Sequence, residues 1–553
     1  MISLKYGGEA LQSKRVLKLA APSVDVFARK ASGLVRQASW FDGFLTSIGT
    51  MNMVWIAVSY IWALSIFPGS LFDVSIVLAT VFCAFNAVLF AQFASMMPRS
   101  GGDYVFNSRG MTPSLGFMFN FSMVVWNMFW TAYTSWILSA ITASSAFTII
   151  GAVTGSEYWT NLGVAAASPE VSFIIGAIVI LFIALVTYLG IRPFFRVMKI
   201  AFVLGMLGIF ALMFVLATSS QAQFVNVFEG FVGAGGYQNV IKTATENGFI
   251  LGTGSWDNTI LAIAIAFQPL GFSIWASYIS GEIKDAKRFK INALAIVGSL
   301  FVMAVFLLIF WYLSVAVLGY DFMGAIGYLY YNVPASSPLL IPPGVQFFGS
   351  LLAQNLVLDI IIAIGFIAWA FLYAPQSMLM VVRCMTAWTI DRLAPKKLGE
   401  VNPRYHTPTW AIALATIISL GFLAFFVFTT GWFSIYGFNA FLGGGTLTFM
   451  AVAVSGIIFP YRKATKQIFE SSPANQRLLG IPWLTINGIV TLLFMGYVTY
   501  LYLMPWSGVA TEASLSFMIG VYVLGIVVYV AARTYQKRKG VPVELIFKEI
   551  PPE

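Results

Sequence analysis

The chain has 553 residues, of which 59% are hydrophobic and only 9% are charged, with 31 Lys and Arg against 21 Asp and Glu. Soluble globular chains carry about 25% charged residues, and disordered chains combine low hydrophobicity with high charge. The composition excludes both classes and predicts an all-α polytopic membrane protein. Two cysteines and one histidine exclude a disulfide scaffold and argue against haem or zinc chemistry. We therefore expect no cofactor and no metal.

Twelve apolar segments are long enough to cross about 30 Å of hydrocarbon as helices. They lie near 43–66, 72–97, 114–150, 170–190, 197–218, 257–280, 290–318, 350–382, 409–429, 433–459, 482–504 and 514–532. If the N-terminus is cytoplasmic, 30 of the 31 basic residues fall inside and only Lys242 falls outside. Basic residues are retained on the cytoplasmic side, and one missed span would invert every later loop. We therefore expect a multi-pass protein of the cytoplasmic membrane with both termini inside. The excess of basic residues then reflects the orientation of the chain in a lipid bilayer, and no nucleic-acid partner is expected.

The loop lengths indicate that the first ten spans form two repeats of opposite orientation. Long connections, 98–113 and 319–349, follow spans two and seven, whereas short links follow spans four and nine. An inverted repeat would leave this pattern. The predicted divisions are a cytoplasmic tail 1–42, a first repeat 43–218, an extracellular loop 219–256, a second repeat 257–459, a cytoplasmic loop with two further helices 460–532, and a cytoplasmic tail 533–553.

Spans one and six each contain a place where the helix could break. In span six, Pro269 removes a backbone donor and Gly271 adds flexibility, with Gln268 and Ser273 beside them. In span one, the polar cluster includes Asn52, whose amide must find partners in lipid. Unwound backbone at this depth is tolerated where it lines a cavity. The competing interpretations are a packed proline kink in span six and helix-to-helix contacts in span one.

Further polar side chains lie in spans three, eight and ten. Each of them alone is typical of helix packing, but together they suggest a polar path through the bundle. The candidates for substrate contact are Asn127, Tyr373, Gln376 and Asn439. For ion coupling the candidates are Ser377, Lys199 and Asp359, although Lys199 is expected chiefly to extend to the cytoplasmic surface.

Three cytoplasmic segments carry a recognisable pattern. Residues 97–106 read Met-Pro-Arg-Ser-Gly-Gly-Asp-Tyr-Val-Phe, which resembles the Pro-Arg-x-Gly-Gly-x-Tyr signature of the amino acid–polyamine–organocation (APC) permeases. Residues 281–288 are similar to the Gly-Glu-x-Lys-x-Pro-x-Arg segment of that superfamily. The stretch 383–408 looks like its long cytoplasmic loop. The order of the three segments, their spacing and their predicted cytoplasmic location agree with the pattern of that superfamily, and the resemblance covers nearly the whole chain.

The resemblance implies a leucine-transporter-like fold of two inverted five-helix repeats plus two peripheral helices. It also implies that the substrate binds on unwound backbone of spans one and six. The matching positions here are Gly49, Thr50, Met51, Asn52 and Met53, and Phe267, Gln268, Gly271, Phe272 and Ser273, with the break at Pro269. The usual Gly-Ser-Gly unwinding point corresponds to residues 49–51, where Met51 replaces the second glycine.

The leading functional prediction is a secondary active permease for amino acids or related small amines. Alternating access would be coupled to H⁺ or Na⁺, or would operate as exchange. The absence of a carboxylate from the middle of any predicted span favours a neutral or zwitterionic substrate. The alternative is a channel, or a carrier for another small organic solute such as a nucleobase. An enzyme is not expected, because no convergent set of nucleophile, base or metal ligands is present.

Overall fold

The computed structural model describes residues 33–339, 341–429, 437, 439–541 and 543–547, and this part of the chain is almost wholly helical. The α-helices are α1 (Trp40–Met51), α2 (Val54–Ile66), α3 (Phe72–Met96), α4 (Asp103–Gly110), α5 (Pro113–Ile137), α6 (Ser144–Thr154), α7 (Glu157–Ala167), α8 (Pro169–Tyr188), α9 (Ile191–Thr218), α10 (Gln221–Val232), α11 (Gly236–Glu246), α12 (Trp256–Leu270), α13 (Phe289–Leu318), α14 (Tyr320–Asn332), α15 (Val345–Ala353), α16 (Leu356–Ile390), α17 (Thr409–Phe428), α18 (Asn439–Phe441), α19 (Leu447–Ile458), α20 (Lys466–Glu470), α21 (Trp483–Tyr502), α22 (Glu512–Arg538) and α23 (Val543–Ile546).

Shorter elements complete this list. Two π-helical segments are η1 (Leu138–Ala143) and η6 (Leu442–Thr446). The 3₁₀ helices are η2 (Ser273–Ile279), η3 (Pro334–Ser336), η4 (Lys396–Gly399) and η7 (Pro505–Ser507). Strands β1 (Arg477–Leu478) and β2 (Ile481–Pro482) form one antiparallel hairpin. Within the described residues, twelve helical segments are long and apolar enough to cross a membrane, which confirms the predicted number.

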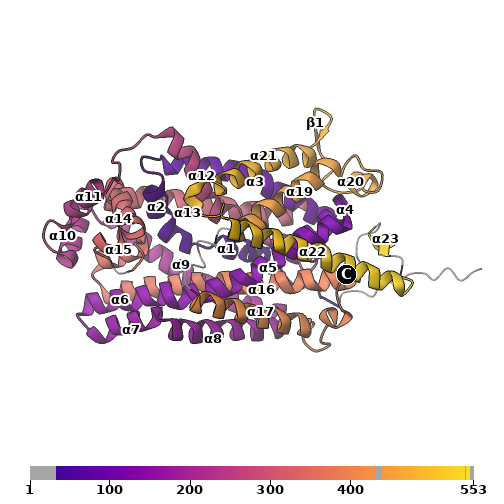
Figure 1. The fold of residues 1–553 in the computed structure, drawn as a ribbon, viewed down its shortest axis with the longest axis horizontal. Coiled ribbons are helices and arrows are strands. Elements are labelled where there is room, and N and C mark those ends of the chain that lie inside the picture. Colours follow the sequence, from indigo (N-terminus) through magenta and orange to yellow (C-terminus); the bar gives the residue numbers. More distant parts are fainter. Residues whose placement is uncertain (1–32, 340, 430–436, 438, 542, 548–553) are drawn as a thin grey trace, which may run out of the picture.

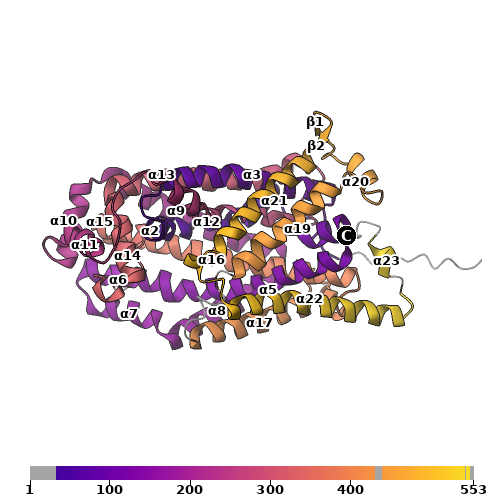
Figure 2. The same cartoon turned by 45° about the horizontal axis from the view of Figure 1, so that its top comes forward.

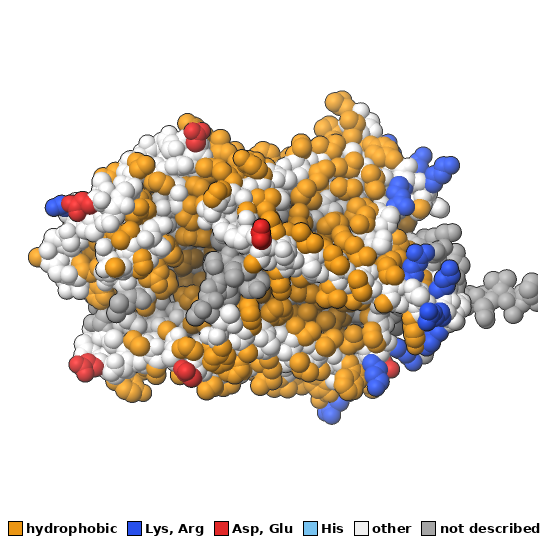
Figure 3. Space-filling model, in the orientation of Figure 1, with side chains coloured by type: hydrophobic (Ala, Val, Ile, Leu, Met, Phe, Trp, Pro, Cys, Tyr) orange, Lys and Arg blue, Asp and Glu red, His pale blue; other side chains and the backbone are white. Residues whose placement is uncertain are grey.

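The twelve spans form an elongated bundle with two different ends (Figures 1 and 2). One end, called here the cap end, carries α10, α11, α14 and α15; the opposite end carries α20, the hairpin and α23. Lys and Arg side chains gather at this second end, called here the basic end, and an apolar belt separates it from the cap end (Figure 3). This charge separation supports the predicted orientation, with the basic end in the cytoplasm, which remains a prediction.

The predicted extracellular loop 219–256 is a helical cap. Helices α10 and α11 fold back on each other and on α14. The ring of Tyr237 in α11 stacks on Phe322 of α14 with centroids 4.6 Å apart, and Phe224 of α10 meets the same ring edge-on at 5.3 Å. The buried aromatic face explains why a segment rich in Gly, Asn and Thr still forms ordered helices.

Span eight begins later than the sequence prediction of 350–382. A short helix, α15, comes first, and Gln354 then turns the chain with a left-handed φ of 43°. The side chain of Asn355 accepts hydrogen bonds from the amides of Val357 and Leu358, so a new helix starts there. The sequence is hydrophobic on both sides of this junction, so hydrophobicity alone did not show where α15 ends and α16 begins.

Span eight also ends later than predicted, because Arg383 does not terminate it. Its guanidinium is paired with Glu282 inside the protein, and α16 continues to Ile390. Arg383 therefore belongs to a helix rather than to the cytoplasmic loop inferred from the resemblance. A paired charge can be buried without ending a helix, whereas the sequence alone shows only an unfavourable residue.

Most other described boundaries agree with the prediction to within a few residues. The exceptions are span five, which begins at Ile191 rather than near 197, and span twelve, which ends at Arg538 rather than near 532. The predicted start of span ten lies outside the described residues. The predicted turn at 430–432 lies outside the described residues, as does most of the tail 1–42. The helix breaks in spans one and six, described next, occupy equivalent places in the two proposed repeats and support that division, whose boundaries stay predictions.

Candidate functional site

Span one breaks at Asn52. Helix α1 ends at Met51, Asn52 has a left-handed φ of 58°, and α2 starts at Val54. Asparagine tolerates this conformation better than most residues. Its side-chain oxygen accepts a hydrogen bond at 3.0 Å from the amide of Val54, the first residue of α2. The break lies inside the predicted region 49–53, but Gly49 itself is still helical, so the predicted unwinding point 49–51 is placed too early.

Span six breaks at Gly271 and Phe272. Helix α12 includes Pro269 in its last turn and ends at Leu270, and η2 begins at Ser273. A Cβ atom at position 271 would lie 2.3 Å from the Phe267 ring, so a larger residue would have to displace that ring. The break predicted from Pro269 is therefore present, two residues after the proline.

The two breaks lie against each other. The Thr50 hydroxyl donates a hydrogen bond to the Phe272 carbonyl oxygen at 3.2 Å. The Ala276 amide donates to the Ser47 hydroxyl oxygen, also at 3.2 Å. Both pairs are buried, and each joins residues more than 200 positions apart in the sequence. The interrupted helices of the two proposed repeats thus form one structural unit at the centre of the bundle.

A cavity of about 650 Å³ extends from these breaks towards the cap end. Asn52 of the first break, Gln268 beside the second and Tyr373 of α16 line it. Its wall is rich in aromatic rings, namely Trp55, Trp62, Trp130, Tyr133, Trp136, Tyr331, Tyr373 and Phe441. No described residue of the wall is charged. The volume lies within the range that holds a small organic ligand.

Of the aromatic wall, only Tyr373 was predicted as part of the site. The signal of the wall in the sequence is the spacing of Trp55, Val58 and Trp62, which places all three on one face of α2. Aromatic residues are common in membrane helices for packing alone. The wall therefore becomes visible only when α2, α5 and α16 are placed around a common space.

Two buried amides near the breaks make no hydrogen bond to the described residues. Neither the nitrogen nor the oxygen of Gln268 has a partner, and the same holds for Gln376. The hydroxyl of Tyr502 lies near Gln268 but donates instead to the Ala264 carbonyl oxygen at 2.8 Å. The Gln376 side chain packs against Gly49. A buried amide without partners costs free energy. Gln268 lines the cavity and is available to a bound solute or water, whereas Gln376 does not line it.

The remaining candidates lie outside the cavity wall. Asn127 donates to the Met123 carbonyl oxygen of its own helix at 2.8 Å, and Asn439 donates to the Ser514 carbonyl oxygen at 2.7 Å. Phe272 packs edge-on against Trp275. Thr50, Met51, Met53, Phe267, Gly271 and Ser273 surround the two breaks without lining the cavity. Their assignment to substrate contact stays a prediction.

The basic end of the bundle is closed by two buried ion pairs. Arg383 of α16 forms two hydrogen bonds with Glu282, of 2.5 and 2.9 Å. Arg109 of α4 forms two with Asp391, of 2.7 and 2.9 Å. All four side chains are at most 2% exposed. These pairs tie α4, the loop after span six and the end of span eight together at the basic end.

A third polar contact lies between these pairs. The Asn120 amide donates to Asp103 at 2.8 Å and its oxygen accepts from the Trp388 indole at 2.7 Å. The Tyr278 ring lies so close to Gly102 that a Cβ atom there would be 2.5 Å away. Gly102 of the signature segment, which also has a positive φ, therefore allows this loop to pack against span six.

The stability of the folded protein should depend on pH through Asp103. The residue lies between the membrane spans, and burial raises the pKa of its carboxyl group to about 7. In the unfolded chain the pKa would be about 3.9. The folded protein therefore binds this proton more tightly, and its contribution to stability falls as pH rises from about 4 to about 7. Between pH 5 and pH 7 the melting temperature of Asp103→Asn should fall less than that of the wild type.

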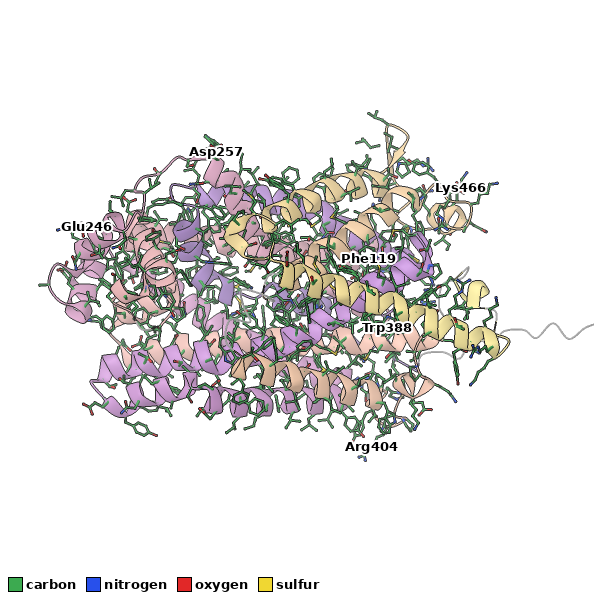
Figure 4. All side chains as sticks on the ribbon, in the orientation of Figure 1. Phe119, Glu246, Asp257, Trp388, Arg404 and Lys466 are labelled. Atoms are coloured by element: carbon green, nitrogen blue, oxygen red, sulfur yellow. The ribbon has the colours of Figure 1, made fainter. Side chains whose placement is uncertain are left out.

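The control for this measurement is Asp257→Asn, which changes an exposed acidic residue at the other end (Figure 4). Its melting temperature should follow the wild-type dependence on pH. Parallel pH profiles for wild type and Asp103→Asn would contradict the assignment of a titrating proton to Asp103.

Two interrupted membrane helices that meet at a central cavity are typical of a membrane transporter rather than an enzyme. The comparisons with known proteins agree. The family described as amino acid permease matches residues 38–530, whereas no curated protein matches the chain. The protein belongs to the amino acid permease family of the APC superfamily. It is a multi-pass membrane protein that transports amino acids or related solutes.

Proposed function

We propose that the protein is a secondary active permease for a neutral or zwitterionic amino acid, or a related small amine, and that it works by alternating access across the cytoplasmic membrane. One observation carries the proposal: the uncharged cavity begins at both helix breaks, with Asn52 and Gln268 in its wall. A substrate there could use backbone and amide groups without a fixed side-chain charge.

The helix ends at the breaks supply partial charges of both signs. The N-terminus of α2 is the positive end of its helix dipole and suits a substrate carboxylate. The C-terminal ends of α1 and α12 are negative and suit an amine. This arrangement favours a solute that carries both groups close together. The aromatic wall towards the cap end would then surround its side chain.

The cavity direction suggests which conformation this is. The wall includes Tyr331 of α14 and Pro342, which lie at the cap end, while the Arg383–Glu282 and Arg109–Asp391 pairs seal the basic end. With the basic end in the cytoplasm, the substrate would enter from outside. Transport then requires the two ion pairs to separate while the cap end closes over the aromatic wall.

The proposal includes coupling to H⁺ or Na⁺, for which three residues were predicted. Lys199 is bound to Asp42 at 2.8 Å and its side chain is 45% exposed, so it ties α9 to α1 near the basic end. Ser377 is buried close to Tyr373. Asp359, which lies in the first turn of α16, has the most distinctive surroundings and is treated below.

A thermal-shift screen of the purified protein tests the substrate class. Neutral amino acids, small amines and nucleobases should be compared, because a ligand that binds the folded state raises the melting temperature. We expect a saturable increase with at least one neutral amino acid or amine. An increase with nucleobases alone would instead favour the alternative carrier function.

A further inference from the structure

A carboxylate is buried near the cap end of the bundle without any partner. The side chain of Asp359 is only 1% exposed. Neither of its oxygens makes a hydrogen bond to the described residues. An isolated ionised carboxylate is costly to remove from water, and buried charges are normally paired or bind an ion. No described protein group supplies a positive charge to Asp359, so the carboxyl group must either bind a proton or, when ionised, bind a cation.

A small void adjoins this carboxylate. Its volume is about 20 Å³, enough for one water-sized particle. Five of the residues around it carry side-chain oxygens, and they are Thr142, Ser145, Gln346, Ser350 and Asp359. The hydroxyl of Thr142 and the amide oxygen of Gln346 also lack hydrogen-bond partners within the described structure. Several unsatisfied oxygens thus surround a space of the right size for a single ion.

The chemistry of the void favours a hard cation of low charge. The described wall contains oxygen groups but no sulfur, imidazole or basic side chain. Carboxylate, carbonyl and hydroxyl oxygens suit hard cations. Only one carboxylate is present, so a monovalent ion balances the charge. A water molecule could donate hydrogen bonds to Asp359, but it would leave the buried negative charge uncompensated.

We propose that this void binds one Na⁺ ion, held by Asp359 together with Thr142 and Gln346 and completed by the neighbouring hydroxyls. The site joins α15 of the cap with the end of span three and the start of α16. It is separate from the substrate cavity, because none of its lining residues lines that cavity. This proposal assigns a specific ion and site to the proposed ion coupling. Binding of Na⁺ does not depend on the proposed transport function, but a role of the bound ion in transport does.

The ion can influence the substrate region through α16. Asp359 and Tyr373 lie in this one helix, and fourteen residues separate them along roughly 21 Å of its axis. Na⁺ bound between α15 and α16 would hold the cap against span eight. Release of the ion would leave Asp359 unpaired and free the cap to move, so ion occupancy would bias the position of a helix that lines the cavity.

Melting curves of the purified protein without substrate test the site directly. NaCl is titrated against choline chloride at constant ionic strength and pH. The wild type should show a saturable rise in melting temperature with Na⁺. Asp359→Asn should lose that rise, and in choline chloride it should melt no lower than the wild type because a buried charge is gone. Glu157→Gln, which changes an exposed acidic residue of α7, should keep the wild-type response.

Thr142→Val provides a second variant that keeps the charge and the side-chain shape. It removes one oxygen ligand, so the Na⁺ concentration for half-maximal stabilisation should rise by roughly tenfold. Retention of the full Na⁺ response in Asp359→Asn would overturn the proposal. Absence of a Na⁺-specific shift in the wild type would also overturn it, even if acidification stabilised the protein through Asp359.

Failure of the ion site can be distinguished from failure of the proposed function. The substrate screen is run on the same preparations in choline chloride. A substrate shift without a Na⁺ shift would leave the permease proposal standing and reject the Na⁺ site. A Na⁺ shift that Asp359→Asn abolishes would support the site even if every tested amino acid and amine gave no shift.

Discussion

Arg383→Met should destabilise the protein by about 3–5 kcal/mol, because it leaves the Glu282 carboxylate buried without its partner. The arginine forms two hydrogen bonds with this residue across 101 positions of sequence, and both side chains are at most 2% exposed. The melting temperature should therefore fall clearly. Arg404→Met, which changes an exposed arginine at the same end, should have little effect (Figure 4).

The same substitution should open the basic end, and a native cysteine reports it. Cys384 is fully buried beside Asn120, with 3.3 Å between its sulfur and the amide nitrogen. In a Cys83→Ser background, labelling of Cys384 by a thiol reagent should be faster in Arg383→Met than in wild type. Adding Glu282→Gln should recover part of the stability, because the uncompensated charge is removed. Unchanged melting and labelling would contradict the role given to this pair.

Gln268→Ala should weaken substrate affinity by about 5- to 150-fold, which corresponds to a cost of about 1–3 kcal/mol for a lost buried hydrogen bond. The folded protein should lose little stability, because this amide has no hydrogen-bond partner among the described residues. Affinity is measured by titrating the substrate in melting experiments and as KM in uptake. The matched control is Gln467→Ala on the exposed surface of α20, which should leave affinity unchanged.

To test the role of Asn52 in substrate binding, glycine is a better substitution than alanine. The φ of 58° at Asn52 and its hydrogen bond to the Val54 amide mean that alanine would strain the backbone as well as remove a ligand. Asn52→Gly keeps the backbone conformation accessible and removes only the side chain. It should also weaken substrate affinity. Wild-type affinity in both Asn52→Gly and Gln268→Ala would refute the placement of the site.

The sequence predicted the number of spans and the two broken helices for clear physical reasons. Hydrophobic length and the sidedness of Lys and Arg determine the membrane topology. Pro269 and Gly271 mark the break in span six because they remove a backbone donor and a side chain. In span one the break falls at Asn52, where a polar residue adopts a conformation that most others avoid. Because the expected unwinding point was matched to Gly49, the predicted break lay slightly before the observed one.

Features that depend on distant contacts could not be predicted. The Arg109–Asp391 pair joins residues 282 positions apart, and nothing in either local sequence identifies the other. Arg383 was expected in a loop because the sequence does not show that Glu282 neutralises it. The aromatic wall also needs several helices around one space. Conversely, Asn439 looked like a binding group but contacts the Ser514 backbone, since a polar residue in a span can serve packing equally well.

Counterflow in proteoliposomes tests the central claim that one central site, exposed to the two sides in turn, carries the substrate. Vesicles are loaded with the unlabelled solute identified by the thermal-shift screen, and uptake of the labelled solute is followed. Alternating access predicts transient accumulation that saturates with concentration, is competed by related amino acids and falls strongly in Gln268→Ala. A linear flux that is neither competed nor accelerated by internal solute would contradict the permease mechanism and indicate a pore.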